Sequence, residues 1–322
     1  MRRLILRRAL VAIPVLWLVV TAAFFAVHAA PGSVEDLVAD PTLSPAARQA
    51  IRAHWGLDRP LHEQYLRWLG AVATGDLGVS FLYHQPVAAV VGRALGPTAL
   101  LTGTALAIDL LLGLGVAVLS VRRPHGAVDR LLGGLSLLLY GMPPFWLALM
   151  AVLVFSLRLG WLPPSHMASV GAAAMAPAAR ALDLLRHLVL PAGVLALAGF
   201  AATARYLRAA LLDVATARHL LAARARGIPP RRLFLVHALR PALLPVATLL
   251  GLAVPALVSG ALVVEVVFSW PGMGRVMWTA ATARDIPVVL ATTLLAAGAV
   301  LGGTLMADLA YAALDPRVRR SV

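Results

Sequence analysis

The 322-residue sequence contains no cysteine and no lysine. Without cysteine, the chain can form no disulfide, thiolate metal site or cysteine nucleophile. Without lysine, it cannot carry a phosphate-binding P-loop, because that motif places a lysine beside the phosphates. Charged residues make up only 13% of the chain, and no long polar region is present from which a soluble domain could be built.

Recognisable catalytic and metal-binding motifs are also missing. The nine histidines show no metal-ligand spacing such as His-Glu-x-x-His. The candidate serines, Ser33, Ser44, Ser80 and Ser269, do not lie in a Gly-x-Ser-x-Gly nucleophile motif. We therefore expect no catalytic residue, metal site or cofactor, and an intramembrane hydrolase has no nucleophile–base pair to support it.

The chain is instead strongly apolar, with 61% hydrophobic residues and a mean hydropathy of +0.86. A helix of about 20 apolar residues crosses about 30 Å of hydrocarbon. Six stretches are long enough: residues 9–27, 97–121, 131–157, 188–204, 241–264 and 286–313. The first exceeds the usual signal-peptide core and lacks a good cleavage site, so we expect a retained helix. The sequence therefore predicts an all-α integral membrane protein with six transmembrane helices.

Arginines mark the orientation of these spans. With the N-terminus inside, the cytoplasmic segments hold 18 of the 28 arginines and only three acidic residues, Asp129, Asp213 and Asp315. The outer segments hold the other 10 arginines together with nine acidic residues. Cytoplasmic loops of membrane proteins carry such an excess of arginine. Both termini are therefore predicted to be cytoplasmic, and the positive charge indicates topology without implying a nucleic-acid partner.

This topology divides the chain into four parts. Residues 1–29 form a cytoplasmic tail and the first transmembrane helix, and residues 30–93 form an extracytoplasmic segment with short helices. Within that segment, residues 43–48 predict a capped helix start, and residues 64–69 predict an amphipathic helix near the membrane surface. Residues 94–313 hold the five remaining spans, and residues 314–322 form a cytoplasmic tail.

A strongly basic loop, residues 218–232, lies between the fourth and fifth spans. Its adjacent alanines, a glycine four residues later and a proline pair predict a short surface helix, a sharp turn and a second helix start. The helix could enter a groove of a partner protein, or it could lie on anionic lipid. The spacing alone leaves both interpretations open. The candidate binding residues are Arg218, His219, Ala222, Ala223, Arg224, Arg226 and Gly227.

Polar residues and prolines inside the spans are a second group of candidates. Asp109 falls near mid-membrane, where an ionised carboxylate costs about 2.5–3.5 kcal/mol, so it either lines a substrate path or bonds a neighbouring helix. Pro143 and Pro144 predict a kink in the third span, with freed carbonyls that could line a cavity. Asp308 is predicted to anchor the end of a helix. Glu265 is predicted to be a packing or interface residue.

The basic loop resembles the cytoplasmic loop of inner-membrane permease subunits of ATP-binding-cassette (ABC) importers. Their pattern is Glu-Ala-Ala, three residues, then Gly, and here Leu221, Ala222, Ala223 and Gly227 stand at that spacing. The wider chain resembles the B-type subunit of the dipeptide/oligopeptide/nickel branch of this family. The supporting stretches are residues 30–32, 56–61, 64–65, 68–69, 75–78, 143–146, 186–191, 237–242, 264–275, 284–287, 308–311 and 314–317.

One departure from this branch falls in the loop. The branch commonly has an acidic–aromatic pair before its alanine–glycine core, and here Arg218 and His219 occupy those positions. Any ATPase contact that depends on the acidic–aromatic pair is therefore in question for this chain. The alanine–glycine core itself is intact.

The resemblance implies a bacterial inner-membrane permease with the type I importer fold. This chain would form half of a translocation pathway, paired with a second, homologous permease in a heterodimer and surrounded by membrane lipid. Two ABC ATPase subunits would bind a coupling loop at residues 209–240, and an extracytoplasmic substrate-binding protein would deliver the cargo. The implied cargo is peptides, with nickel complexes or glutathione as further possibilities. The alternative is a self-contained secondary transporter or channel, for which Asp109 is the one plausible intramembrane charge.

Overall fold

The computed structural model describes residues 2–29, 58–243 and 260–314, with isolated described residues at 46, 49, 56, 253 and 255–258. Apart from an isolated antiparallel bridge between Val79 and Pro86, every regular element in these ranges is a helix. The all-helical class is therefore confirmed for the described part of the chain.

Four helices are long and apolar enough to cross a membrane: α1 (Arg2–Ala29), α5 (Val87–Arg122), α8 (Pro177–Ala215) and α15 (Ile286–Leu314). A broken pair, α6 (Ala127–Gly141) with residues 144–158, makes a fifth if the pair is counted as one span. Four to five apolar helices confirm a multi-pass membrane protein. Most of the predicted span at 241–264 lies outside the described residues, so the count of six stays a prediction.

The helices extend well beyond the apolar stretches that predicted them. α8 has 39 residues, where hydropathy marked only residues 188–204, and α5 begins at Val87, ten residues before the predicted start. At 1.5 Å per residue, α8 is about 58 Å long and exceeds the hydrocarbon thickness of about 30 Å. Hydropathy missed the extensions because they carry polar residues, which are compatible with a helix outside the hydrocarbon.

The third span is broken at its proline pair. Gly141 ends α6, Pro144 begins α7 (Pro144–Ala151), and the two halves meet at an angle of 100°. Pro144 stands at the first helical position, where its missing N–H costs nothing. The Pro143 carbonyl accepts hydrogen bonds from the backbone N–H groups of Trp146 and Leu147, so a new helix starts there. The predicted kink is thus a break between two helices that meet at 100°.

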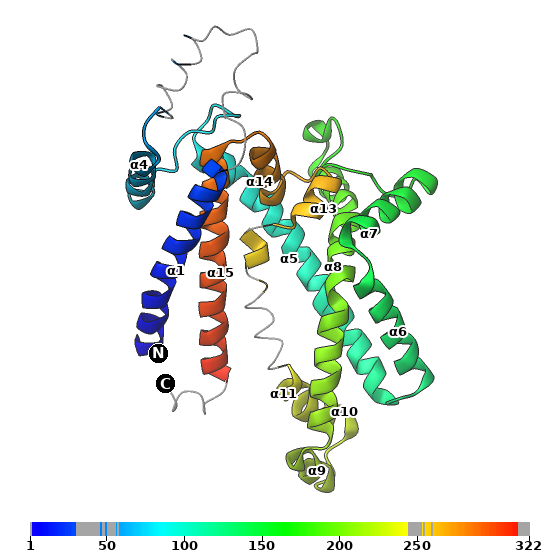
Figure 1. The fold of residues 1–322 in the computed structure, drawn as a ribbon. Helices are drawn as coiled ribbons and strands as arrows, with labels where there is room; N and C mark the ends of the chain where they lie inside the picture. Colours follow the sequence, from blue (N-terminus) through cyan, green and yellow to red (C-terminus); the bar gives the residue numbers. More distant parts are fainter. Residues whose placement is uncertain are drawn as a thin grey trace.

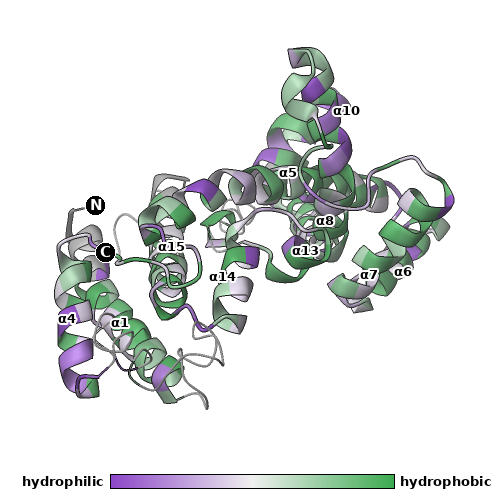
Figure 2. Cartoon of the chain, turned by 90° about the horizontal axis from the view of Figure 1, so that it is seen from above, coloured by the Kyte–Doolittle hydropathy of each residue, from purple (hydrophilic) through white to green (hydrophobic). Residues whose placement is uncertain are grey.

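Two groups of helices stand side by side in Figure 1. α1 packs along α15, while α5 packs along α8, with α6 and α7 on the outer side of α8. The amphipathic helix predicted around residues 64–69 is α4 (Leu61–Ala73), and Tyr65 joins it to α1 through a 2.7 Å hydrogen bond with Thr21. Figure 2 shows hydrophobic residues along the long helices and hydrophilic residues on α4 and around α10 (Pro230–Arg232).

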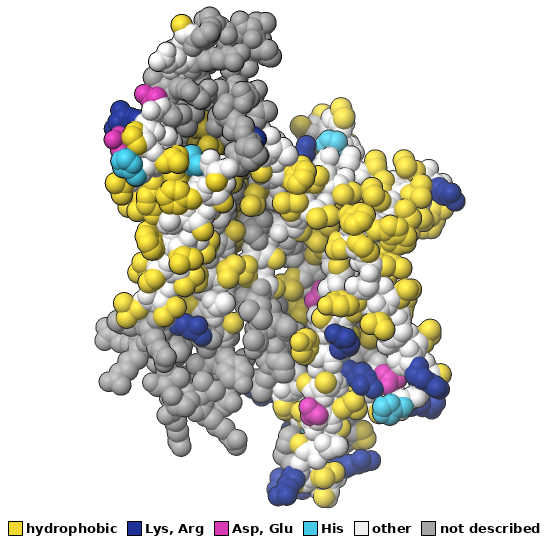
Figure 3. Space-filling model, viewed as in Figure 1, with side chains coloured by type: hydrophobic (Ala, Val, Ile, Leu, Met, Phe, Trp, Pro, Cys, Tyr) yellow, Lys and Arg dark blue, Asp and Glu magenta, His cyan; other side chains and the backbone are white. Residues whose placement is uncertain are grey.

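The helix ends divide into two sets at opposite ends of the molecule. The start of α1, the end of α15 and the short helix α9 (Arg218–Ala225) lie at one end, while α4 and α14 (Met273–Thr282) lie at the other (Figure 1). Figure 3 shows arginine side chains gathered at the α9 end, below a broad hydrophobic surface. The predicted asymmetry of positive charge is therefore visible in the fold.

Two buried polar residues, Ser80 and Asp285, form hydrogen bonds at the end of the molecule opposite α9. The Ser80 hydroxyl donates a hydrogen bond to the Asp285 carboxylate, and the backbone N–H of Leu82 donates to the same carboxylate at 3.1 Å. Both side chains are fully buried. The segment before α5 is thereby attached to the start of α15, although the two are 205 residues apart in the sequence.

Candidate functional site

The basic loop folds as its sequence predicts. After α9, Gly227 takes the left-handed conformation, with φ of +76°. Its N–H donates to the Arg224 carbonyl at 3.0 Å, and the N–H of Ile228 donates to the Ala223 carbonyl at 3.4 Å. This pair of bonds is a Schellman motif, in which glycine avoids the strain that a Cβ would bring. Pro230 then begins α10 at its first helical position.

The two alanines of the loop have different environments. Ala223 is buried and α9 packs against η3 (Leu233–Leu239), so this alanine holds α9 onto the rest of the protein. Ala222 is exposed, as is Leu221 beside it. A partner could therefore contact Ala222 but not Ala223. The other exposed candidates of the loop are Arg218, Arg224, Arg226 and Gly227, while the side chain of His219 lies outside the described residues.

α9 is joined closely to the long helix α8. Only Thr216 and Ala217 separate the two helices. The Thr216 hydroxyl donates to the Asp213 carbonyl at 2.9 Å, the Ala217 N–H donates to the Val214 carbonyl at 3.0 Å, and the Ala217 carbonyl accepts from Leu220. With these bonds the connection between α9 and α8 is short and hydrogen-bonded throughout.

An ion pair joins α8 to the start of α6 near this connection. The Arg208 guanidinium donates two hydrogen bonds to the Asp129 carboxylate, from Nε at 2.9 Å and from Nη2 at 2.7 Å. The backbone N–H of His125 donates to the same carboxylate at 2.9 Å. Two parallel bonds of this kind give a fixed orientation as well as attraction. In the sequence, Asp129 and Arg208 contributed only to the count of charges that indicates topology. The one feature that could have suggested the pair is that Asp129 is the single acidic residue in an arginine-rich loop.

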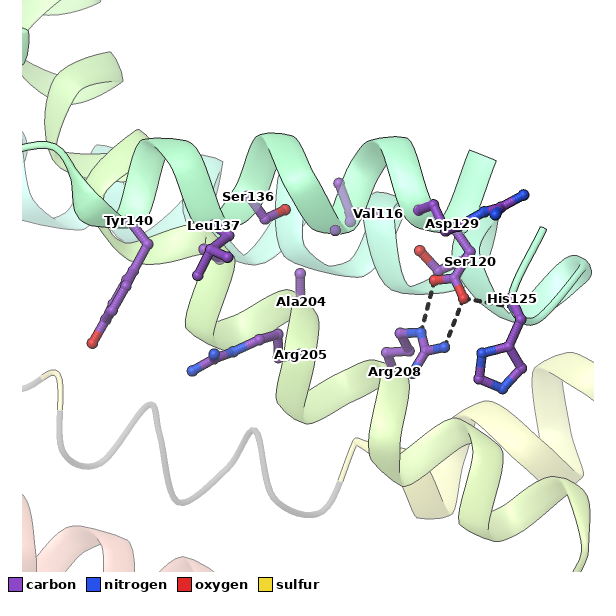
Figure 4. Close-up of a pocket in the computed structure, with 13 residues that line it drawn as sticks. Val116, Ser120, His125, Asp129, Ser136, Leu137, Tyr140, Ala204, Arg205 and Arg208 are labelled. Carbon is purple, nitrogen blue, oxygen red and sulfur yellow. Dashed lines mark hydrogen bonds and ion pairs between the residues drawn. The ribbon is translucent and has the colours of Figure 1, made fainter. Parts of the chain in front are cut away.

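A cavity of about 290 Å³ lies beside this ion pair, between α5, α6 and α8. In Figure 4, Tyr140, Leu137 and Ser136 reach it from α6, and Arg205 and Arg208 reach it from α8. The guanidinium carbon of Arg205 lies 5.7 Å from the centre of the Tyr140 ring, within the range of a cation–π contact. The cavity thus combines an apolar wall with a basic rim.

Asp109 and the proline pair lie apart from α9. Asp109, on α5, points at α8, where the Thr203 hydroxyl donates to its Oδ2 at 3.0 Å. A Cβ on Gly199 would lie only 3.2 Å from Oδ1, so the carboxyl is held closely against α8. The sequence allowed two roles for Asp109, a place on the substrate path or a bond to a neighbouring helix. The hydrogen bond from Thr203 is a bond of the second kind. Pro143 and Pro144 stand at the break after α6, three residues beyond Tyr140 of the cavity.

Glu265, on α13 (Leu262–Val267), organises the opposite end of the molecule. Its buried carboxylate accepts hydrogen bonds from the Thr98 hydroxyl at 3.0 Å and from the Arg275 backbone N–H at 3.0 Å. The chain passes so close that a Cβ on Gly272 would lie 2.5 Å from the carboxylate carbon. Residues 264–275, singled out in the sequence, therefore fold around one carboxylate, in agreement with the packing role proposed for Glu265.

We expect Glu265→Gln to lower the free energy of unfolding by about 1–2 kcal/mol, because one carboxylate oxygen becomes an amide that faces a donor. Denaturant unfolding of the purified permease in detergent measures the change. Glu63→Gln is the control, since the Glu63 side chain on α4 is 45% exposed and forms a surface ion pair with Arg59 at 3.7 Å; it should change stability by less than about 0.5 kcal/mol. Equal effects of the two substitutions would contradict the structural role of Glu265.

Within the described residues, no three His, Asp or Glu side chains come together as metal ligands. The structure has a basic, exposed helix, α9, next to the end of the long membrane helix α8, and an ion pair that joins α8 to α6. Together with the apolar spans, they define a multi-pass membrane protein with a basic, exposed helix at one end.

Comparison with known proteins identifies the family. Residues 109–320 match the model of the binding-protein-dependent transport system inner membrane component, and residues 1–102 match the model of the N-terminal part of such membrane components. The chain belongs to this family. It is therefore a permease subunit of an ABC transport system, and its place is in the inner membrane, as the sequence predicted. Subunits of this family carry out no catalysis themselves.

The chain is similar to several curated relatives along its whole length. The oligopeptide transport system permease protein AppB of Bacillus subtilis is 37% identical over 315 residues, which cover 98% of each chain. A putative peptide permease protein of Brucella suis is 36% identical over 322 residues, or 99% of each chain. The glutathione transport system permease protein GsiC of Escherichia coli is 33% identical over 315 residues, or 98% of each chain.

Proposed function

We propose that this chain forms half of the translocation pathway of an ATP-driven importer of peptides. Two of its relatives are named as oligopeptide or peptide permeases, and the third as a glutathione permease. Glutathione is itself a tripeptide, so the three names share one chemical class of cargo. Nickel complexes, which the family resemblance also allows, are the alternative cargo.

The proposed topology has six spans, with both termini and α9 in the cytoplasm. Support comes from the arginine excess in the corresponding segments and from the position of α9 at the same end of the molecule as the start of α1 and the end of α15 (Figure 1). In this arrangement residues 1–29 supply the first span, and residues 30–93 lie outside. Residues 94–313 form the five-helix core of a type I importer, and residues 314–322 return to the cytoplasm.

In the proposed mechanism, an ABC ATPase binds the exposed surface of α9. One of two ATPase subunits would dock on this chain and the other on a second, homologous permease, while an extracytoplasmic binding protein delivers cargo at the opposite end. The lysine-free chain has no P-loop of its own, which is why the nucleotide chemistry is assigned to partners. When the ATPases close, they would move α9 and switch the pathway between two states.

The observation that carries this proposal is the continuous connection from α9 into α8. A rigid α9 attached through two residues to a helix of 39 residues can pass motion from the cytoplasm through the membrane. The Asp129–Arg208 ion pair would carry that motion on to α6. The coupling loop is thus proposed to extend over residues 209–240, with Arg218, Ala222, Arg224 and Arg226 on the contact surface.

Transport by reconstituted subunits tests the proposal. The chain is purified alone, and also together with a homologous permease, ABC ATPases and a binding protein, and each preparation is placed in proteoliposomes. We expect ATP-dependent uptake of a radiolabelled tripeptide by the full complex, and none by a complex whose ATPases lack the P-loop lysine. Uptake by the chain alone, driven by an ion gradient, would instead establish the secondary-transporter alternative.

A further inference from the structure

The cavity between α5, α6 and α8 has a chemistry that the coupling mechanism does not use. Its wall is formed by apolar and small side chains, among them Val116, Leu137 and Ala204. Its rim carries Arg130, Arg205 and Arg208 together with His125. Figure 3 shows arginine side chains gathered below a hydrophobic surface, toward the end of the molecule that holds α9. A ligand for this cavity therefore needs an anionic part and an apolar part.

The positive charge of the rim is only partly compensated. Arg208 is neutralised by Asp129, which is the one acidic residue lining the cavity. No described acidic side chain lies within ion-pair distance of Arg205 or Arg130, so two positive charges remain at the rim. Arg205 rests over the ring of Tyr140, a contact that orients the guanidinium while its in-plane N–H groups stay available for oxygen ligands.

The apolar wall continues onto the outer surface of α6. Leu137 lines the cavity and is itself 65% exposed, and Tyr140, which lines it from the same face of α6, is exposed as well. In a membrane protein such a surface faces hydrocarbon or another membrane helix. A molecule bound at the arginine rim could therefore extend an acyl chain along α6 without leaving an apolar environment.

We propose that this cavity binds the headgroup of an anionic phospholipid such as phosphatidylglycerol. The phosphate would lie at Arg205 with Arg130 on the same rim, and the acyl chains would lie against Leu137 and Tyr140 on the exposed side of the cavity. Basic pockets between membrane helices bind anionic headgroups in this way. Bound lipid would join α6 to α8 beside the Asp129–Arg208 ion pair and stabilise the coupled arrangement of the two helices.

The same charges argue against a peptide in this cavity. A free peptide is a zwitterion, and its amino group needs an acceptor or a negative charge. Asp129 is the only acidic residue among the described residues of the lining, and its two oxygens already accept bonds from Arg208 and from the His125 N–H. The rim therefore matches a ligand whose net charge is negative.

Lipid binding to the purified chain in detergent tests the inference independently of transport. Phosphatidylglycerol should raise the thermal unfolding temperature and should be retained in native mass spectra, whereas phosphatidylcholine and soluble glycerol 3-phosphate should do neither. Arg205→Gln should weaken phosphatidylglycerol binding at least about fivefold, since one arginine near a headgroup contributes about 1 kcal/mol. Leu137→Asp, which places negative charge in the apolar wall of the cavity, should weaken it as well.

Arg180→Gln is the matched control, because Arg180 is an exposed arginine near the opposite end of the same helix; it should bind the lipid as the unmodified chain does. Unfolding temperatures in phosphatidylcholine verify that each variant is folded. Equal effects of the two phospholipids, full binding by Arg205→Gln, or equal stabilisation by glycerol 3-phosphate would overturn the inference. So would stabilisation by a tripeptide that Arg205→Gln abolishes, because the cavity would then be a cargo site.

Discussion

Gly227→Val is expected to reduce cargo-stimulated ATP hydrolysis by the assembled transporter about tenfold. The φ of Gly227 is +76°, a conformation that costs a residue with a Cβ about 1–2 kcal/mol and a β-branched residue more. Relief of that strain would break the two Schellman bonds and redirect the chain between α9 and α10. A difference of about 1.4 kcal/mol in a coupling equilibrium corresponds to the tenfold loss. The measurement is ATPase activity in nanodiscs with and without loaded binding protein.

Two further substitutions separate backbone strain from crowding. A Cβ at Gly227 would meet no heavy atom within 4 Å, so strain is the only direct cost of the change. Gly227→Asn should therefore keep most of the coupling, since asparagine adopts the left-handed conformation readily. Gly171→Val carries the same backbone strain away from α9. Gly171 is exposed, has a φ of +83° and precedes the N-terminal end of α8. Loss of coupling in Gly171→Val equal to that in Gly227→Val would show that α9 has no special role.

The fold of the loop could be predicted because its signals are local. Gly227 and the pair Pro229–Pro230 specify a helix end and a helix start through their own backbone preferences, whatever surrounds them. The amphipathic helix α4 could likewise be predicted from local features of its sequence. The accessibility of the alanines could not be predicted, because it depends on which face of α9 is covered, and η3 packs against α9 from later in the sequence.

Hydropathy found the membrane helices but not their lengths or directions. It reports the part of a helix that is apolar, so the polar ends of α8 were invisible to it. It also treated residues 131–157 as one span, whereas the Pro143–Pro144 pair ends one helix and begins another at 100°. A proline pair predicts some disturbance of a helix, but the angle depends on what each half packs against.

The polar contacts that hold the helices together were beyond sequence reasoning. Asp129 and Arg208 are 79 residues apart, Thr98 and Glu265 are 167 apart, and Ser80 and Asp285 are 205 apart. No periodicity or motif links such positions in a single sequence. For Asp109 the sequence left two roles open, and only the position of Thr203 on α8 shows that its carboxyl bonds a neighbouring helix.

The Asp129–Arg208 ion pair supports the second large expected effect. We expect Asp129→Asn to lower the free energy of unfolding by about 3 kcal/mol, because it leaves the Arg208 charge without its partner. This value of about 3 kcal/mol is at the low end of the range for breaking a buried ion pair, because the Arg208 side chain is 30% exposed. Asp213→Asn is the control, as Asp213 is exposed on the same helix as Arg208 and its substitution should cost less than about 0.5 kcal/mol.

A double-mutant cycle then tests whether the pair also transmits motion. Asp129→Asn combined with Arg208→Gln removes both charges, so its stability should lie above the sum expected from the single variants by about 1–2 kcal/mol. If the pair carries motion from α8 to α6, this double variant regains stability but not cargo-stimulated ATP hydrolysis. Recovery of both would limit the ion pair to a structural role, and coupling would then have to reach α6 through the apolar contacts between α6 and α8 alone.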